Sequence, residues 1–148
     1  MPTATDAEGN QVALLDTSTA IALVVEDHEA HRATLDAVRG RQLGLAGHAW
    51  FETYSVLTRL PPGLRRTPSD VVRLLAHNFP ASGFLGEAES FDLAKELAGI
   101  GISGGAVYDA LVGAAARQHR RPLLSGDARA RAVYEALDVE IVQIPLAV

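Results

Sequence analysis

The sequence contains no cysteine among its 148 residues. It therefore has no disulfide framework, no zinc–thiolate site, no iron–sulfur cluster and no cysteine nucleophile. Long apolar runs are also missing, since none approaches the ~20 residues of a membrane span. The polar opening, MPTATDAEGNQ, lacks the basic and apolar segments of a signal peptide. These absences predict a soluble cytoplasmic protein without a membrane partner.

Basic residues are scarce as well. There are 13 Lys and Arg against 18 Asp and Glu, a formal net charge of −5, and Lys95 is the only lysine. A surface that binds phosphates usually needs positive charge, so this balance at first disfavours a nucleic-acid binder. Apolar residues make up 48% of the chain, which rules out a mainly disordered protein. The length suits one domain.

Short apolar runs alternate with amphipathic segments along the chain. Residues 1–11 form a polar lead-in, and the domain spans residues 12–148. The pattern predicts strands over 12–15, 43–46, 79–85, 123–125 and 139–144. It predicts helices over 20–25, 26–39, 48–60, 67–78, 87–98, 106–119 and 128–137. Such alternation indicates an α/β fold in which helices flank a short, mostly parallel sheet.

Two aspartates follow predicted strands directly. Asp16 comes after the apolar run 12–15, and Asp127 comes after the run 123–125. In parallel sheets, ligands bind at the carboxyl ends of strands, which meet at one edge. Each residue could instead cap the next helix, a role for which aspartate is well suited.

Two further acids lie on predicted helices. Asp109 is surrounded by small and apolar residues and has no basic residue three or four positions away. The helix dipole favours an acid near a helix start, but it does not account for this apolar setting. Glu52 shares a helix face with His48, Ser55 and Arg59. For Glu52 alone, a solvated polar stripe is the plainer interpretation.

Together these carboxylates suggest a site for a hard divalent cation. Mg²⁺ and Mn²⁺ prefer oxygen ligands, and clustered carboxylates repel one another unless a cation is bound. Such clusters serve reactions at phosphoryl oxygens, where a metal activates water and stabilises the attacking and leaving oxygens.

Five segments of the chain resemble the PIN-domain ribonucleases of the VapC toxin type. They are VALLDTS (12–18), WFETYSVL (50–57), YDALVGAAA (108–116), LLSGDAR (123–129) and YEALDVEIV (134–142). The resemblance covers about residues 12–144. The sequence departs from the family pattern at Gly126 and in the glycine-rich stretch 101–105.

The resemblance implies a PIN-like domain that binds Mg²⁺ or Mn²⁺ and cleaves RNA. The implied metal-binding and catalytic residues are Asp16, Glu52, Asp109 and Asp127, with Ser18 and Ser125 as polar neighbours. It further implies a small VapB-like antitoxin that covers the site, and a homodimer. A PIN fold that only binds a partner, and a metal-dependent phosphohydrolase of another class, remain the alternatives.

Other enzyme classes lack their signatures in this sequence. Ser18 stands where haloacid-dehalogenase-type phosphatases need a second acid, and Lys95 does not follow a strand as a receiver domain requires. The glycine-rich stretch 99–105 follows a helix, so it is interpreted as a loop and not as a dinucleotide-binding turn. The H-E-x-x-H and G-x-S-x-G motifs are absent.

Arginines and histidines complete the set of candidates. Phosphate contacts are possible for two groups of arginines, although ordinary surface positions are the plainer interpretation of each: 59, 65, 66 and 73, and 117, 120 and 121. Part of the first group could instead contact the antitoxin. His28 and His31 are expected to face solvent, and His48 to approach Glu52. When the four proposed ligands are set aside, 14 of the 18 acids remain against 13 bases, a net charge of −1. The predicted RNA binding therefore depends on the metal.

Overall fold

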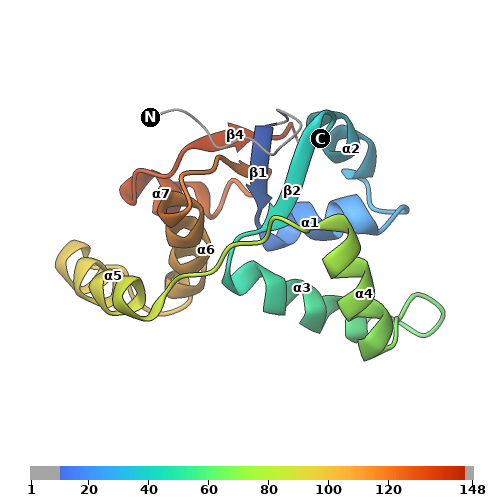
Figure 1. Ribbon diagram of the computed structural model, residues 1–148, viewed down its shortest axis with the longest axis horizontal. Helices are drawn as coiled ribbons and strands as arrows, with labels where there is room; N and C mark the ends of the chain where they lie inside the picture. The colour runs from blue at the N-terminus through green and yellow to red at the C-terminus, as the bar shows by residue number, and fades with distance from the viewer. Residues whose placement is uncertain (1–10, 146–148) are drawn as a thin grey trace.

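A parallel four-stranded sheet lies at the centre of the protein, whose computed structural model describes residues 11–145 (Figure 1). The strands are β1 (Gln11–Leu15), β2 (Arg41–Leu45), β3 (Leu123–Ser125) and β4 (Ile141–Gln143). Their order is β2-β1-β3-β4, and all neighbouring pairs are parallel. Leu15 lies opposite both Leu45 and Leu124, so the carboxyl ends of three strands share one edge. The predicted α/β class is confirmed.

Helices cover both faces of this sheet. They are α1 (Thr17–Val24), α2 (His31–Ala37), α3 (His48–Thr58), α4 (Pro68–Asn78), α5 (Glu87–Ile100), α6 (Ala106–Gln118) and α7 (Arg131–Ala136). Among the described residues, no helix is long and apolar enough to cross a membrane.

Two apolar clusters hold the helices to the sheet, because successive strand residues point to opposite faces. On one face, Leu14 and Leu123 pack with buried residues of α5, α6 and α7. On the other, Ala13, Leu15 and Leu124 pack with residues of α1, α3 and α4. This arrangement explains the continuous apolar runs of β1 and β3, since both of their faces are covered.

The strand predicted over 79–85 is wrong. This segment runs beside β2 and makes one isolated parallel bridge, between Ala46 and Gly83. Pro80 has no N–H to donate, and the Ser82 hydroxyl accepts from the Leu45 N–H where a strand would offer a carbonyl. A regular ladder therefore does not form.

Two predicted helices also differ from the structure. The helix predicted over 26–39 is shorter, because residues 25–30 form a turn in which the Ala30 N–H donates to His28 Nδ1. The helix predicted from residue 128 begins at Arg131, because Asp127 accepts backbone N–H groups and closes a turn first. The lead-in predicted over 1–11 lies outside the described residues except for Gln11, which opens β1.

Candidate active site

An acidic cavity of about 350 Å³ opens at the carboxyl edge of the sheet. All four acids singled out in the sequence line it: Asp16, Glu52, Asp109 and Asp127. Ser18 also lines it, whereas Ser125 is buried behind Asp16. Asp16 and Asp127 reach the cavity from the ends of adjacent strands, and Glu52 and Asp109 reach it from α3 and α6. The structure thus brings together residues that are up to 111 positions apart in the sequence.

Asp16 is both a helix cap and the most enclosed acid of the cavity. Its carboxylate accepts the Thr19 N–H (3.1 Å) at the start of α1, so the capping interpretation is also right. It accepts from the hydroxyls of Ser125, Tyr134 (3.2 Å) and Ser18 (3.3 Å) as well. Asp16 is only 3% exposed. Burial raises its pKa, and the hydrogen bonds from Ser125, Thr19 and Tyr134 act in the opposite direction.

Ser125 connects the two acids that follow the strands. Its hydroxyl donates to Asp16 and accepts the Asp127 N–H (3.1 Å). The Asp127 carboxylate in turn accepts the N–H groups of Arg129 (2.9 Å) and Ala130 (3.2 Å). Asp127 therefore closes the turn before α7 and faces the cavity with the same side chain.

Asp109 has a counter-charge that the sequence analysis did not find. The Arg129 guanidinium donates to both of its carboxylate oxygens, at 3.1 and 3.4 Å, and to Asp127 at 3.4 Å. The Asp109 side chain is 16% exposed, whereas that of Arg129 is 72% exposed. The bonds to Asp109 raise the pKa of Arg129. Arg129 stands two positions after Asp127, and this spacing is the signal that could have identified it.

Glu52 lines the cavity, and 39% of its side chain is also exposed, so it belongs both to the cavity and to the polar stripe expected from the sequence. His48 Nε2 lies 3.8 Å from its carboxylate, as expected from their helical spacing. Burial raises the pKa of Glu52; the charge of His48 opposes this, while those of Asp109 and Asp16 add to it. The carboxylates of the cavity are therefore close enough to disfavour one another's ionisation.

Tyr134 and His28 are the other residues that sequence reasoning missed. Tyr134 lies buried on α7, and its burial together with the charges of the nearby acids raises the pKa of its hydroxyl. Tyr134 and Asp16 are 118 positions apart, so no local pattern in the sequence points to this contact. His28 lines the acidic cavity, and the His31 ring lies 3.0 Å from the Ala22 carbonyl oxygen. The expectation that both histidines face solvent is wrong.

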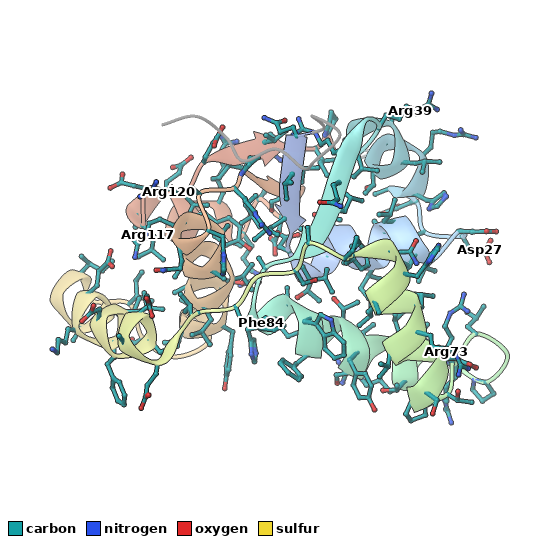
Figure 2. The ribbon with its side chains drawn as sticks, in the orientation of Figure 1. Asp27, Arg39, Arg73, Phe84, Arg117 and Arg120 are labelled. Carbon is teal, nitrogen blue, oxygen red and sulfur yellow. The ribbon has the colours of Figure 1, made fainter. Side chains whose placement is uncertain are left out.

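The arginines proposed from the sequence lie elsewhere. Arg117, near the end of α6, pairs with Glu96 (2.8 Å), Arg73 on α4 pairs with Asp70, and Arg121 donates to the Ala81 carbonyl. Figure 2 labels Arg73 and Arg117. None of these seven arginines lines the acidic cavity. Within the described part of the chain, the arginine that lines it is Arg129. Phosphate contacts by the others stay a prediction.

The chemistry of the acidic cavity fits a hard divalent cation. Its four carboxylates supply the oxygen ligands that Mg²⁺ and Mn²⁺ prefer. As the side chains stand, no three acidic or imidazole groups within residues 11–145 converge closely enough to enclose an ion. Asp16 is directed to Ser125 and Tyr134, and Arg129 holds the other two aspartates. A cation would therefore compete with Arg129 for Asp109 and Asp127.

Residues 13–136 match the family model of the PIN domain. The chain is 48% identical to ribonuclease VapC27 of Mycobacterium tuberculosis over 128 residues, which cover 86% of this chain and 93% of that protein. It is 44% identical to ribonuclease VapC40 of the same organism over 128 residues, covering 85% and 94%.

Two solved structures share the fold. VapBC2 from Rickettsia felis, bound to a DNA fragment from its promoter, matches with a TM-score of 0.64 and 11% identity, covering 91% of this chain and 100% of that chain. FitAcB from Neisseria gonorrhoeae matches with a TM-score of 0.60 and 18% identity, covering 90% and 97%. At these identities the likeness concerns the fold alone.

Proposed function

The chain belongs to the PIN-domain family and is of the VapC type, and on this premise we propose that it is a metal-dependent endoribonuclease, the toxin of a VapBC-type pair. The observation that carries the proposal is the convergence of four carboxylates on one cavity at the carboxyl edge of a parallel sheet. The relatives named as ribonucleases support the activity. The expected place of action remains the cytoplasm.

We assign Mg²⁺, or Mn²⁺ in its place, to this cavity. Asp16 and Asp109 would bind it directly, and Glu52 and Asp127 would complete its surroundings, partly through water. When bound, the cation supplies charge stabilisation at the phosphodiester oxygens and lowers the pKa of water.

The chain's own residues orient the reaction. Ser125 and Tyr134 hold the Asp16 carboxylate in place through their hydroxyls. Glu52, with its raised pKa, accepts the proton of the attacking water. Water attacks phosphorus in line with the 3′ oxygen and the P–O3′ bond breaks. The leaving 3′ oxygen takes up a proton from solvent, so the products carry a 5′-phosphate and a 3′-hydroxyl.

The proposed partner is a VapB-like antitoxin that covers the aromatic surface beside the cavity. Phe51 is 58% exposed, and its ring centroid lies 6.2 Å from that of Phe84. Phe84 is labelled in Figure 2. Tyr108 is also exposed, and its ring stacks on that of His48, which lies one turn before Glu52 on α3. Exposed apolar groups of this kind are typical of protein interfaces. A homodimer is proposed as well, to be checked by light scattering of the purified chain.

The test is RNA hydrolysis by the purified chain, freed of any partner, with Mg²⁺ or Mn²⁺. Asp16→Asn and Asp109→Asn should each lower the rate by at least about 100-fold, the order seen when one electrostatic contact to a transition state is lost. Chelation of the metal should do the same. Asp36→Asn is the control, because Asp36 lies on α2 and pairs with Arg39 on the surface.

Two results would contradict the proposal. If the wild-type chain cleaves no RNA with either metal, the alternative of a PIN fold that only binds a partner is favoured. If phosphomonoesters are hydrolysed and RNA is not, another class of metal-dependent phosphohydrolase is favoured.

A further inference from the structure

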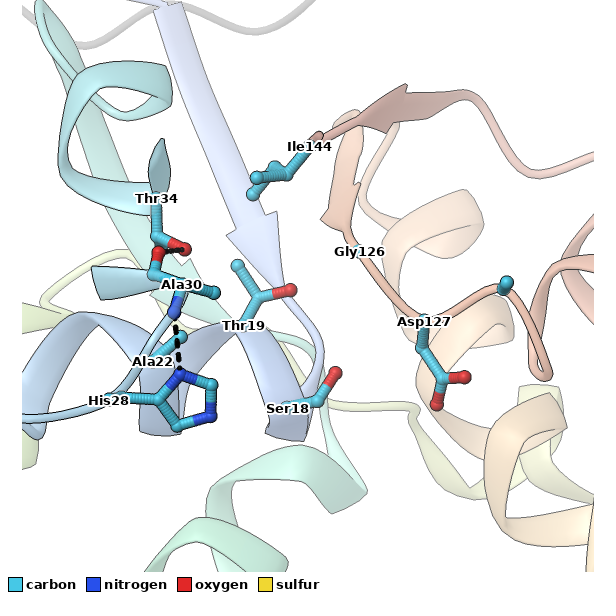
Figure 3. Close-up of a pocket in the computed structure, with 10 residues that line it drawn as sticks. Ser18, Thr19, Ala22, His28, Ala30, Thr34, Gly126, Asp127 and Ile144 are labelled. Carbon is cyan, nitrogen blue, oxygen red and sulfur yellow. Dashed lines mark hydrogen bonds between the residues drawn. The ribbon is translucent and has the colours of Figure 1, made fainter. Parts of the chain in front are cut away.

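A second cavity, of about 240 Å³, lies directly beside the acidic cavity (Figure 3). It is bounded on one side by α1 and the start of α2, and on the other by the loop after β3. Ser18, His28 and Asp127 line both cavities. A molecule that occupies one cavity can therefore extend into the other without leaving the protein surface.

The second cavity has apolar walls and a buried hydroxyl without a partner. Ala22, Ala30 and Ile144 supply the apolar wall. Thr19 is 4% exposed, and its Oγ1 makes no hydrogen bond of normal geometry within the described part of the chain, although it lies close enough to Asp16 to lower the pKa of that carboxyl. Buried polar groups are nearly always paired, and an unpaired one is costly. A ligand with a polar edge would supply the missing partner.

His28 offers a second polar contact of defined direction. The Ala30 N–H donates to its Nδ1 at 3.0 Å, the bond drawn in Figure 3. Because Nδ1 accepts this bond, the proton of the neutral ring is on Nε2. The ring thus keeps an N–H donor for a ligand, at the boundary between the two cavities.

We propose that the second cavity binds one base of the RNA strand whose phosphodiester lies in the acidic cavity, an inference that rests on the proposed function. The cavity is smaller than the about 300 Å³ at which pockets for drug-sized ligands begin, which suits a single flat ring. Sequence-specific recognition of single-stranded RNA works through contacts to the edges and faces of unstacked bases. Apolar walls with Thr19 and His28 provide both kinds of contact.

The proposal is tested by NMR titration of the full chain with the four ribonucleoside 5′-monophosphates, and with ribose 5-phosphate as the probe without a base. At least one nucleotide should bind more tightly than ribose 5-phosphate and shift the amide signals of Thr19, Ala22 and Gly126. Thr19→Val removes the hydroxyl and keeps the shape, and His28→Phe removes the donor and keeps a flat ring. Each substitution should weaken binding of that nucleotide roughly three- to tenfold, which corresponds to the loss of one hydrogen bond.

Thr19→Val should leave the affinity for ribose 5-phosphate unchanged. His28 also lines the acidic cavity, so His28→Phe is judged by the ratio of the two affinities, which should fall for the selected nucleotide relative to ribose 5-phosphate. His77→Phe is the matched control, because His77 lies exposed on α4. Ribose 5-phosphate binding as tightly as every nucleotide would overturn the proposal, and so would shifts confined to the acidic cavity. A chain that selects a base here but cuts no RNA contradicts the proposed function and supports this inference. A chain that cuts RNA without base-selective binding contradicts this inference alone.

Discussion

Asp16 shows how one side chain serves both the fold and the site. It caps α1, accepts hydrogen bonds from two buried hydroxyls and lines the acidic cavity. The cap fixes where the helix begins, and the hydroxyls from β3 and α7 fix where the carboxylate points. Substitutions of its hydrogen-bond donors should therefore change the chemistry of Asp16 without displacing the backbone.

Tyr134→Phe is expected to move the acid limb of the cleavage pH profile to higher pH. The Tyr134 hydroxyl lowers the pKa of Asp16, so its removal raises that pKa further, and Asp16 then ionises only at higher pH. The maximal rate should fall less than about tenfold, because the ring and its packing are kept. Tyr54→Phe is the control, since Tyr54 stacks on Trp50 and does not line the cavity. An unchanged acid limb would show that the Tyr134 bond does not tune Asp16.

Arg129→Gln is expected to strengthen Mn²⁺ binding several-fold, as measured by calorimetry. Arg129 pairs with Asp109 and Asp127, so a cation must displace it. The gain is limited because this guanidinium is mostly exposed, and exposed ion pairs contribute only about 0–1 kcal/mol. Arg131→Gln is the matched control, because Arg131 pairs with Glu135 outside the cavity. Weaker Mn²⁺ binding in Arg129→Gln would instead assign Arg129 a supporting role.

The sequence predicted the acids of the cavity better than their partners. Asp16 and Asp127 follow apolar strands, and Asp109 stands out in an apolar helix, so local patterns reveal them. The contacts from Arg129 and Tyr134 span 20 and 118 residues. The Arg129 contact with Asp127 is local, but the contacts with Asp109 and Asp16 depend on how α7 and the turn before it pack against α6 and the sheet, which no local spacing reports.

At the scale of elements, β2 is held by a close contact that only glycine permits. A Cβ atom at Gly44 would overlap the backbone of Ala81 and Ser82, which run along the outer edge of this strand. The same contact explains why residues 79–85 accompany β2 without forming the predicted strand. Pro80 and Ser82 interrupt the backbone ladder, but the Ala81 N–H still donates to the Leu43 carbonyl.

Gly44→Ala is expected to lower the free energy of unfolding by about 1–3 kcal/mol or more, the usual effect of overpacking. The obstructing atoms belong to the backbone, so the segment 81–82 must shift as a whole. Gly99→Ala is the matched control: Gly99 lies on exposed α5 with no atom near its missing Cβ, and alanine should stabilise the helix by about 0.5–1 kcal/mol. Urea denaturation measures both. Equal stability of the two variants would contradict the close contact at β2.

At the scale of the whole molecule, the net charge of −5 has a location. Four of the 18 acids line one cavity, and the basic side chain found beside them in the described part of the chain is that of Arg129. The acidic balance that at first disfavoured a nucleic-acid binder thus reflects in part a candidate metal site. The fold class followed from the alternation of strands and helices, whereas the second cavity depends on the turn at residues 25–30, which the helical pattern concealed.

Divalent cations are expected to raise the melting temperature at neutral pH and to lose this effect in acid. Burial raises the pKa values of Asp16 and Glu52, so without a cation the folded state loses stability as pH rises above their ordinary values of 3.8 and 4.5. A cation bound to the ionised carboxylates offsets this loss. At 100 times its Kd it would add about 2.7 kcal/mol, roughly 5–10 °C for a chain of this size. Below pH 4, protons occupy these groups in the folded state and the gain should vanish, as calorimetric scans with and without Mn²⁺ would show. Asp109→Asn should reduce the gain at pH 7 and Asp36→Asn should keep it, whereas an equal gain in both variants would place the cation outside the acidic cavity.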